Sequence, residues 1–323
     1  RFRNASLSVI VLLIGLATLV FQPSSSAALS GCLEPEGQWQ LGPTGVVATA
    51  GNLAVYSRGV TIEIADVTDP SNPVILGVTE IGGAPAAIAV SGTLAFVAAD
   101  DEGFFVIDFA NPSAPSVVGQ WGGQTNQAWD IAASDDHVYV AYGRLIVVDV
   151  RDPSSPVDVA RESTWAISKL ELVGNFVYGA SGSWLVAFDV SDPTTPEIMF
   201  HESGPYSSHL AANDQRLLMT DAGRLSVYTL DNPASPVFVT EYNDPATYFQ
   251  SMAIDGTHAY ITTYHDEFAI VDTTDPANPS TTATIAVPGD PRYVAVSDQT
   301  AYLTAEEGGL RIIDVADSTG PIE

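Results

Sequence analysis

The sequence contains almost no lysine or cysteine. Its 323 residues include one lysine, Lys169, and one cysteine, Cys32. A single cysteine excludes an internal disulfide, so the folded domain is stabilised by packing alone. Lys and Arg number 11 against 39 Asp and Glu, for a formal net charge of −28. Such a surface repels phosphate backbones and therefore argues against nucleic acid as a partner, whereas it suits cations, basic proteins or a salty medium.

Several common sequence signals are also missing. The chain has no Gly-rich phosphate loop, no Gly-x-Ser-x-Gly elbow and no two-histidine metal motif. No stretch beyond the amino terminus has a period of about 3.6 residues, so helices are not expected. Hydrophobic residues nevertheless make up 46% of the chain, which is enough to bury a substantial core. These features favour an all-β fold.

The amino terminus differs in composition from the rest. Arg1 and Arg3 precede the uncharged apolar run 5–21, which is typical of an export signal. The residues Leu-Ser-Gly before Cys32 resemble the lipobox of bacterial lipoproteins, whose cysteine is lipidated and becomes the first mature residue. We predict a signal peptide over residues 1–31 and lipidation of Cys32. Ordinary cleavage a few residues earlier, or retention of the apolar run as a membrane anchor, are the alternatives.

Residues 32–323 are organised as seven repeats. An Asp/Asn-Pro dipeptide recurs at intervals of 40 to 43 residues, and a second proline follows four positions later. The first residue of this motif is, in the seven units, Asp69, Asn111, Asp152, Asp192, Asn232, Asp275 and Asp317, of which the last lacks the first proline. Most units contain four short runs rich in Val, Ile, Tyr and Phe, bounded by turn residues. This pattern predicts one seven-bladed β-propeller.

The seventh unit has only three of the four runs. Residues 36–42, ahead of the first unit, contain Gly37-Gln38-Trp39, which repeats Gly119-Gln120-Trp121 from an outer run. We predict that residues 36–42 supply the outer strand of the last blade and so close the ring.

The third run of each unit resembles the pentapeptide of the LVIVD-repeat family of prokaryotic surface proteins. The matching segments are FFVID (104–108), LIVVD (145–149), LVAFD (185–189), FAIVD (268–272) and LRIID (310–314). The resemblance covers residues 34–323 and implies a propeller on an exported protein. It implies no activity and no catalytic residues. The Asp that ends most of these segments is expected to cap the following turn rather than to bind a metal.

Candidate functional positions are those where the repeats agree in place but differ in residue type. The residue at the start of each innermost strand is, in order, Val46, Ala87, Asp130, Lys169, His209, Ser251 and Tyr293. Because this strand lines the channel of a propeller, polar residues should gather at the channel mouth. Loops on the same face add aromatic residues and an arginine. The predicted contact residues are Trp129, Asp130, Trp165, Lys169, Tyr206, His209, Phe249, Arg292 and Tyr293. Direct pairing of acid with base, and aromatic residues that plug the channel, form the alternative.

Acidic loops on that face are candidate calcium ligands. They include Asp100, Asp101, Glu306 and Glu307, although their spacing does not match a dedicated calcium loop. Solvated turns are the alternative interpretation. No other cofactor is predicted.

The sequence thus predicts an exported protein of the cell envelope or exterior, tethered by lipid at Cys32, that binds a protein or glycan at the cell surface. Contact with the membrane is expected only through the N-terminal lipid or apolar run. One alternative is an extracellular hydrolase or lyase with His209 as general base. Another is a structural component of a surface layer.

Overall fold

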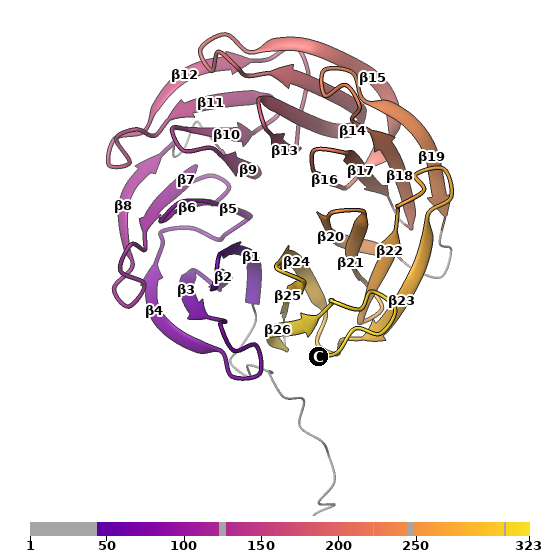
Figure 1. Ribbon diagram of the computed structural model, residues 1–323. Helices are drawn as coiled ribbons and strands as arrows, with labels where there is room; N and C mark the ends of the chain where they lie inside the picture. The colour runs from indigo at the N-terminus through magenta and orange to yellow at the C-terminus, as the bar shows by residue number, and fades with distance from the viewer. Residues whose placement is uncertain (1–43, 123–126, 222, 244–247, 307) are drawn as a thin grey trace, which may run out of the picture. The chain divides into compact units, whose positions relative to one another are not determined.

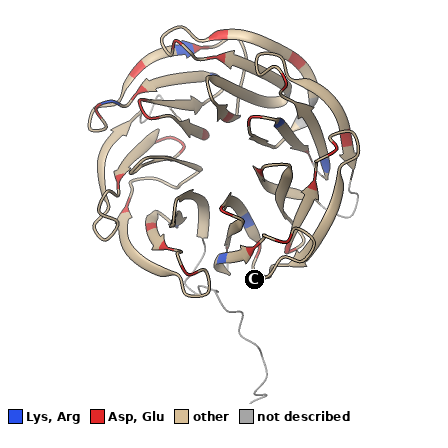
Figure 2. Ribbon diagram, viewed as in Figure 1, with Lys and Arg blue, Asp and Glu red and all other residues tan. Residues whose placement is uncertain are grey.

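The strands form seven antiparallel sheets arranged as the blades of a propeller (Figure 1). The computed structural model describes residues 44–323 apart from 123–126, 222, 244–247 and 307. All 26 elements in the described part of the chain are strands. The predicted all-β, seven-bladed architecture is confirmed. Asp and Glu occur around the whole ring and far outnumber Lys and Arg (Figure 2).

The first three blades each contain four strands. Blade one is β1 (Thr44–Ala50), β2 (Leu53–Arg58), β3 (Thr61–Asp66) and β4 (Val74–Glu80). Blade two is β5 (Ala87–Ser91), β6 (Leu94–Ala98), β7 (Phe104–Asp108) and β8 (Ser116–Trp121). Blade three is β9 (Asp130–Ala133), β10 (His137–Ala141), β11 (Leu145–Asp149) and β12 (Val157–Glu162).

Blade four is β13 (Lys169–Val173), β14 (Phe176–Asp189) and β15 (Glu197–Ser207). Its long β14 covers both middle positions, because its first half pairs with β13 and its second half with β15. Blade five is β16 (His209–Ala212), β17 (Arg216–Asp221), β18 (Arg224–Thr229) and β19 (Val237–Asn243). Blade six is β20 (Phe249–Asp255), β21 (His258–Thr263), β22 (Glu267–Asp272) and β23 (Ser280–Ala286). Blade seven is β24 (Pro291–Ser297), β25 (Thr300–Ala305) and β26 (Gly309–Asp314).

The core consists of seven apolar clusters, one between each pair of adjacent blades. The cluster between blades one and two, for example, combines Ile62 and Ile64 with Phe105 and Ile107. The middle strands supply most of the fully buried side chains, since they are covered on both faces. Every blade is therefore stabilised by its two neighbours rather than by a core of its own.

Blade seven contacts blade one and completes the ring. Tyr56 of β2 packs in one cluster with Leu310 and Ile312 of β26. The Thr44 hydroxyl lies 2.9 Å from the Ala305 carbonyl oxygen and 3.1 Å from that of Gly309, both on blade seven. The chain therefore enters β1 beside β26. The predicted closing strand, residues 36–42, lies outside the described residues and stays a prediction.

The turn after each third strand is built as expected. The Asp66 Oδ1 atom accepts a hydrogen bond from the Thr68 amide at 2.9 Å, and Asp272 does the same for Thr274 at 2.7 Å. Equivalent bonds from amides two residues on are made by Asp108, Asp149, Asp189 and Asp314. The structural interpretation of these carboxylates is confirmed.

The same turns pack against the preceding blade. In β8 of blade two, a Cβ atom added at Gly119 would lie 2.0 Å from the Pro153 carbonyl oxygen of blade three. In β23 of blade six, the Thr282 hydroxyl donates to the Ser318 carbonyl oxygen of blade seven at 2.9 Å. The Asp/Asn-Pro turn is thus a contact between blades as well as a chain reversal.

Replacement of Gly119 by alanine tests this contact. The added methyl group has no room beside the Pro153 backbone, so Gly119→Ala should lower the free energy of unfolding by about 1–3 kcal/mol. The matched control is Gly320→Ala, where the nearest atom to the new Cβ is 3.5 Å away and little change is expected. Denaturant unfolding measures the stability of both variants. A Gly119→Ala variant as stable as wild type would contradict the close approach of Gly119 to the Pro153 backbone.

Candidate functional site

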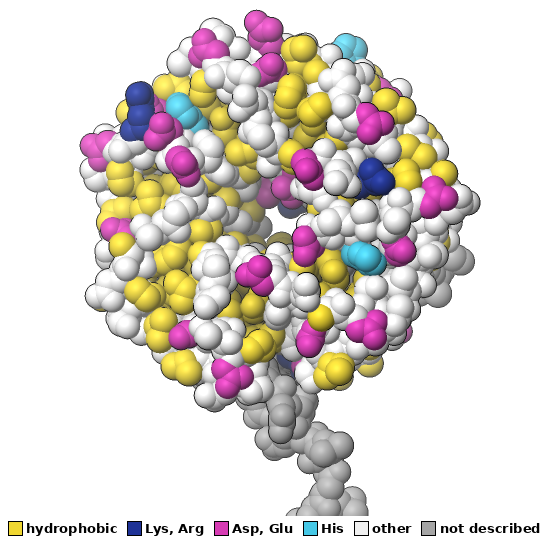
Figure 3. Space-filling model, in the orientation of Figure 1, with side chains coloured by type: hydrophobic (Ala, Val, Ile, Leu, Met, Phe, Trp, Pro, Cys, Tyr) yellow, Lys and Arg dark blue, Asp and Glu magenta, His cyan; other side chains and the backbone are white. Residues whose placement is uncertain are grey.

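A cavity of about 280 Å³ occupies the mouth of the central channel. All seven residues predicted to start the innermost strands line it, so their predicted position is confirmed. Their role in binding remains a prediction. Figure 3 shows the channel as an opening at the centre of the ring, with acidic side chains around it.

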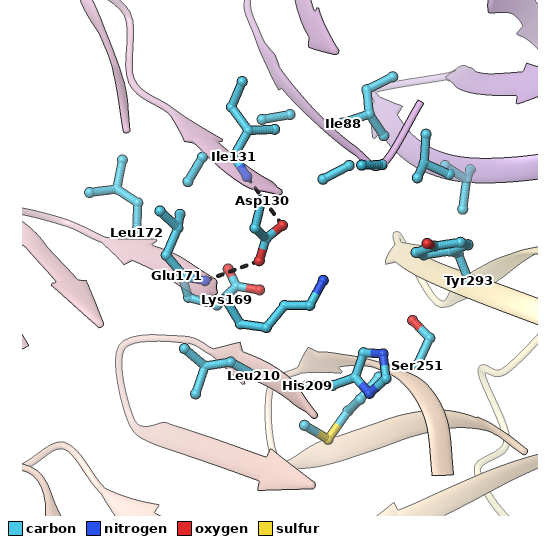
Figure 4. Close-up of a pocket in the computed structure, with 18 of the residues that line it drawn as sticks. Ile88, Asp130, Ile131, Lys169, Glu171, Leu172, His209, Leu210, Ser251 and Tyr293 are labelled. Atoms are coloured by element: carbon cyan, nitrogen blue, oxygen red, sulfur yellow. Dashed lines mark hydrogen bonds between the residues drawn. The ribbon is translucent and has the colours of Figure 1, made fainter. Parts of the chain in front are cut away.

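The mouth is polar on one side and apolar on the other. Blades one and two contribute Val46, Val47 and residues 86–90, which are all Ala, Ile or Val. Blades three to seven contribute the polar side chains Asp130, Lys169, Glu171, His209, Ser251 and Tyr293, which converge on the cavity in Figure 4. Seven similar strands therefore produce a mouth with a distinct polar arc.

Asp130 is fixed by backbone donors at the join of blades three and four. Its Oδ2 atom accepts a hydrogen bond from the Leu170 amide at 3.0 Å, and its Oδ1 atom accepts one from its own neighbour Ile131 at 3.1 Å. Burial raises the pKa of Asp130, while the charge of Lys169 and these two bonds oppose the rise. The two backbone hydrogen bonds therefore fix the orientation of the Asp130 carboxyl group.

Lys169, the one lysine of the chain, points into the cavity (Figure 4). Within the described ranges its ammonium group makes no ion pair and no hydrogen bond. The alternative that Asp130 and Lys169 simply pair directly is therefore not what the structure shows. Water or a ligand must solvate the ammonium group.

Glu171 is a residue that the sequence analysis missed. It lies two positions after Lys169 on β13, and side chains at that spacing share a side of a strand. The equivalent residues of the other blades are all alanine, namely Ala48, Ala89, Ala132, Ala211, Ala253 and Ala295. The signal was present in the repeats as one carboxyl group in a ring of alanines.

Burial and neighbouring charges change the acidity of the mouth. Burial and the nearby Asp130 carboxylate raise the pKa of Glu171 to about 8, against the opposing charge of Lys169. Burial and Lys169 lower the pKa of His209 to about 4. Near neutral pH, Glu171 is thus mostly protonated and His209 is uncharged. Asp130 and Lys169 are the other acidic and basic side chains that line the mouth.

Below the mouth the channel becomes apolar. A second cavity of about 320 Å³ shares Glu171, and its other lining residues are Ala, Val, Ile, Met and Thr. Glu171 therefore marks the boundary between the polar mouth and the apolar interior.

Aromatic rings pair at matching places on three blades. In blade three, Trp129 meets Tyr142 edge to face at 5.0 Å between ring centroids. In blade four, Trp165 contacts Trp184 at 4.7 Å, and in blade six Tyr248 lies 6.1 Å from His265. One ring of each pair precedes the innermost strand. The other follows the second strand in blades three and six, and in blade four it is Trp184, in the second half of β14. We call these three pairs the aromatic pairs.

The aromatic pairs are partly open to solvent. Trp129 is 39% exposed, Trp184 43% and Tyr248 53%. Trp165 is held more firmly, because it also stacks on His201 at 4.6 Å and packs against the core between blades three and four. Trp184 and His201 are further residues that the sequence analysis did not select.

Of three further predicted contact residues, one lies in the core, one forms ion pairs and one has a side chain that the structure does not describe. Phe249 is a correction: it is only 4% exposed, because it packs in the core between blades five and six, at the start of β20 where the first four residues are all buried. Arg292 forms ion pairs with Asp290 at 2.7 Å and Glu306 at 2.9 Å. The side chain of Tyr206 lies outside the described residues.

The calcium candidates do not gather at one point in the described part of the chain. Asp101 accepts a hydrogen bond from Gln127, and Glu306 pairs with Arg292. Asp100 lies in a turn with φ of 42°, and Glu307 is not among the described residues. In that part of the chain no group of three or more His, Cys, Asp or Glu residues could hold a metal ion.

A family model for the LVIVD repeat matches five segments, 82–121, 126–164, 167–201, 247–286 and 288–323, which together exceed half of the chain. The chain belongs to the LVIVD-repeat family. A search of curated proteins gives no match. The described residues of this LVIVD-repeat protein contain no helix that is long and apolar enough to cross a membrane.

Several solved structures of distant sequence are similar to this LVIVD-repeat protein. The β-propeller domain of Cps50 (Swd1) from Myceliophteria thermophila has a TM-score of 0.73 at 12% identity, covering 88% of this chain and 99% of that one. The designed protein Ika8 has a TM-score of 0.60 at 12% identity, covering 85% and 96%. BamB from Moraxella catarrhalis has a TM-score of 0.57 at 16% identity, covering 83% of each chain. At these identities the likeness shows the fold alone.

The raised pKa of Glu171 predicts a pH-dependent difference in stability. The ordinary pKa is 4.5 and the folded value about 8, so the contribution of this group is fully present below pH 4.5 and is lost as pH rises through 8. Because glutamine does not ionise, Glu171→Gln should match wild type at pH 4 and exceed it at pH 9 by roughly 2 kcal/mol, a value reduced for water in the channel.

Denaturant unfolding across this pH range measures the difference. The exposed Glu80→Gln is the control and should follow the wild-type profile. Parallel profiles for wild type and Glu171→Gln would show that Glu171 titrates normally.

Proposed function

We propose that this LVIVD-repeat protein is an exported binding module that captures a protein or glycan partner on its channel-mouth face. The observation that supports this most strongly is the recurrence of the aromatic pairs on blades three, four and six. Trp129, Trp184 and Tyr248 are partly exposed, so packing within the propeller does not account for the whole of these rings. Aromatic residues at a surface contribute large contact areas at low entropic cost.

Charge limits the kind of partner. With 39 acidic residues and 11 basic ones, the surface repels strongly anionic polymers. Planar rings such as Trp184 bind the apolar faces of neutral sugars and the apolar or basic side chains of proteins. A neutral glycan or a neutral to basic protein surface is therefore the expected partner.

The enzyme alternative receives less support from the site. A general base works best when its pKa lies near the operating pH. Burial and Lys169 lower the pKa of His209 to about 4, which makes it a weak base at neutral pH. Binding accounts for the arrangement without requiring proton transfer.

Export and lipid attachment belong to the same proposal. The apolar run 5–21 follows two arginines, and Cys32 is the one cysteine of the sequence. Lipidation there would hold the propeller at the surface of a membrane while its faces remain accessible. The proposed location is the cell envelope.

A capture experiment with an aromatic variant tests the binding function. Residues 32–323 would be immobilised and exposed to an envelope extract and to arrayed neutral and anionic glycans. The variant Trp129→Ala, Trp184→Ala, Tyr248→Ala removes one exposed ring from each aromatic pair and should reduce capture at least tenfold, or about 1.4 kcal/mol.

The matched control replaces three exposed apolar residues on outer strands, Val78→Ala, Val157→Ala and Val237→Ala. It should capture as wild type does, and all three proteins should melt at similar temperatures. Equal capture by the aromatic variant would show that the aromatic pairs are not the contact surface. Self-association of the pure protein in place of capture would favour the surface-layer alternative.

Lipid attachment is tested separately in the producing cell. Wild type should incorporate a radiolabelled fatty acid and fractionate with membranes, whereas Cys32→Ser should lose the label. Release of the variant into the soluble fraction would support tethering by lipid. A membrane-bound, unlabelled wild type would instead indicate a retained apolar anchor.

A further inference from the structure

The channel mouth holds an acidic and a basic side chain, Asp130 and Lys169, that form no ion pair with each other. Asp130 is held by the amides of Leu170 and Ile131, which fix its carboxylate at the join of two blades. Lys169 extends from the neighbouring strand into the cavity (Figure 4), and the described residues offer its ammonium group no ion-pair partner. A ligand with one charge of each sign could satisfy both groups.

Other polar side chains lie near each of these two residues. Glu171 lies beside Asp130, and its carboxyl group has acceptor oxygens for a ligand ammonium group. Ser251 and Tyr293 bring hydroxyl groups to the opposite side of the cavity, where the Lys169 ammonium group points. Hydroxyl and ammonium donors suit a carboxylate. The mouth thus has an acceptor side and a donor side.

The remaining wall is apolar. Val46, Ala87 and Ile88 line the mouth across from the polar arc, and the interior below Glu171 is lined largely by alanine, valine and methionine. An apolar group of a ligand could bury itself there, whereas a second polar group would lose its water without a partner.

Simpler ligands fit these groups less well. A cation alone would be attracted by Asp130 but repelled by Lys169. An anion alone would be attracted by Lys169 but repelled by Asp130. A metal ion would meet at most two carboxyl groups beside an ammonium group, and the described residues contain no metal-holding cluster. A fully apolar molecule would leave both charges buried and unpaired.

We propose that the channel mouth binds a small zwitterion with an apolar substituent, which is the chemistry of an apolar α-amino acid. Its ammonium group contacts Asp130 and Glu171, its carboxylate contacts Lys169 with Ser251 and Tyr293, and its side chain lies against blades one and two. This site is separate from the aromatic pairs. The proposal that it binds a zwitterion can therefore be tested independently of partner capture.

The single lysine provides a reporter for the test. Isotope-labelled lysine places one labelled side chain in residues 32–323, at Lys169. These residues include the whole compact unit Pro35–Glu323. The NMR signal of its ε-methylene group would be followed during titration with L-leucine. We expect a saturable shift.

Three probes each lack one feature of leucine. Isocaproate lacks the ammonium group, isoamylamine lacks the carboxylate and glycine lacks the apolar side chain. Each should bind at least tenfold more weakly than leucine. Asp130→Asn keeps an oxygen acceptor for the Leu170 amide but removes the charge, and should weaken leucine binding at least tenfold. Val78→Ala, on an outer strand and outside the channel lining, should leave leucine binding unchanged.

Two results would overturn the proposal. One is the absence of any saturable shift with leucine up to its solubility limit. The other is equal binding of leucine and any one of the three probes, because the feature that the probe lacks would then contribute nothing. Loss of partner capture in the aromatic variant with leucine binding intact would separate this site from the proposed function.

Discussion

Side-by-side apolar packing between blades is the constraint on which the rest of this protein depends. Each blade has two apolar faces and no core of its own, so it is stable only when a neighbour covers each face. An open row would leave two faces in water, and the contact of Tyr56 with Ile312 across the join removes that cost. The channel is a consequence, because seven blades that pack by their faces leave their innermost edges unopposed.

The repeated turns serve the same packing. The Asp/Asn-Pro segment reverses the chain and then lies against the outer strand of the preceding blade, as Pro153 does at Gly119. The turns are alike in all blades, and each blade needs the same contact with its neighbour. The residues of the channel mouth and of the aromatic pairs do not form this contact between blades. They can therefore differ from one blade to the next. Blade four departs furthest from the repeat there, with Lys169, Glu171 and Trp184.

The sequence predicted which residues line the channel mouth better than it predicted which side chains contact one another. The repeat alignment placed Asp130, Lys169 and His209 correctly on the channel, because strand order in a propeller blade is fixed. It selected Phe249, which packs in the core between blades five and six. It passed over Glu171, whose distinction appears only when the second channel-facing position of every repeat is compared. Trp184 and His201 were missed because they join Trp165 only through pairing of β14 with β15.

The sequence by itself determined the number of blades, the turn chemistry and the family, since each is carried by local residues repeated at a regular interval. Only the tertiary structure decided which side chains share an environment. The raised pKa of Glu171 arises from burial and from Asp130 on the neighbouring blade, and Lys169 and Asp130 meet the same cavity from two adjacent blades. Such quantities depend on distances between residues some forty positions apart, and ring closure sets those distances.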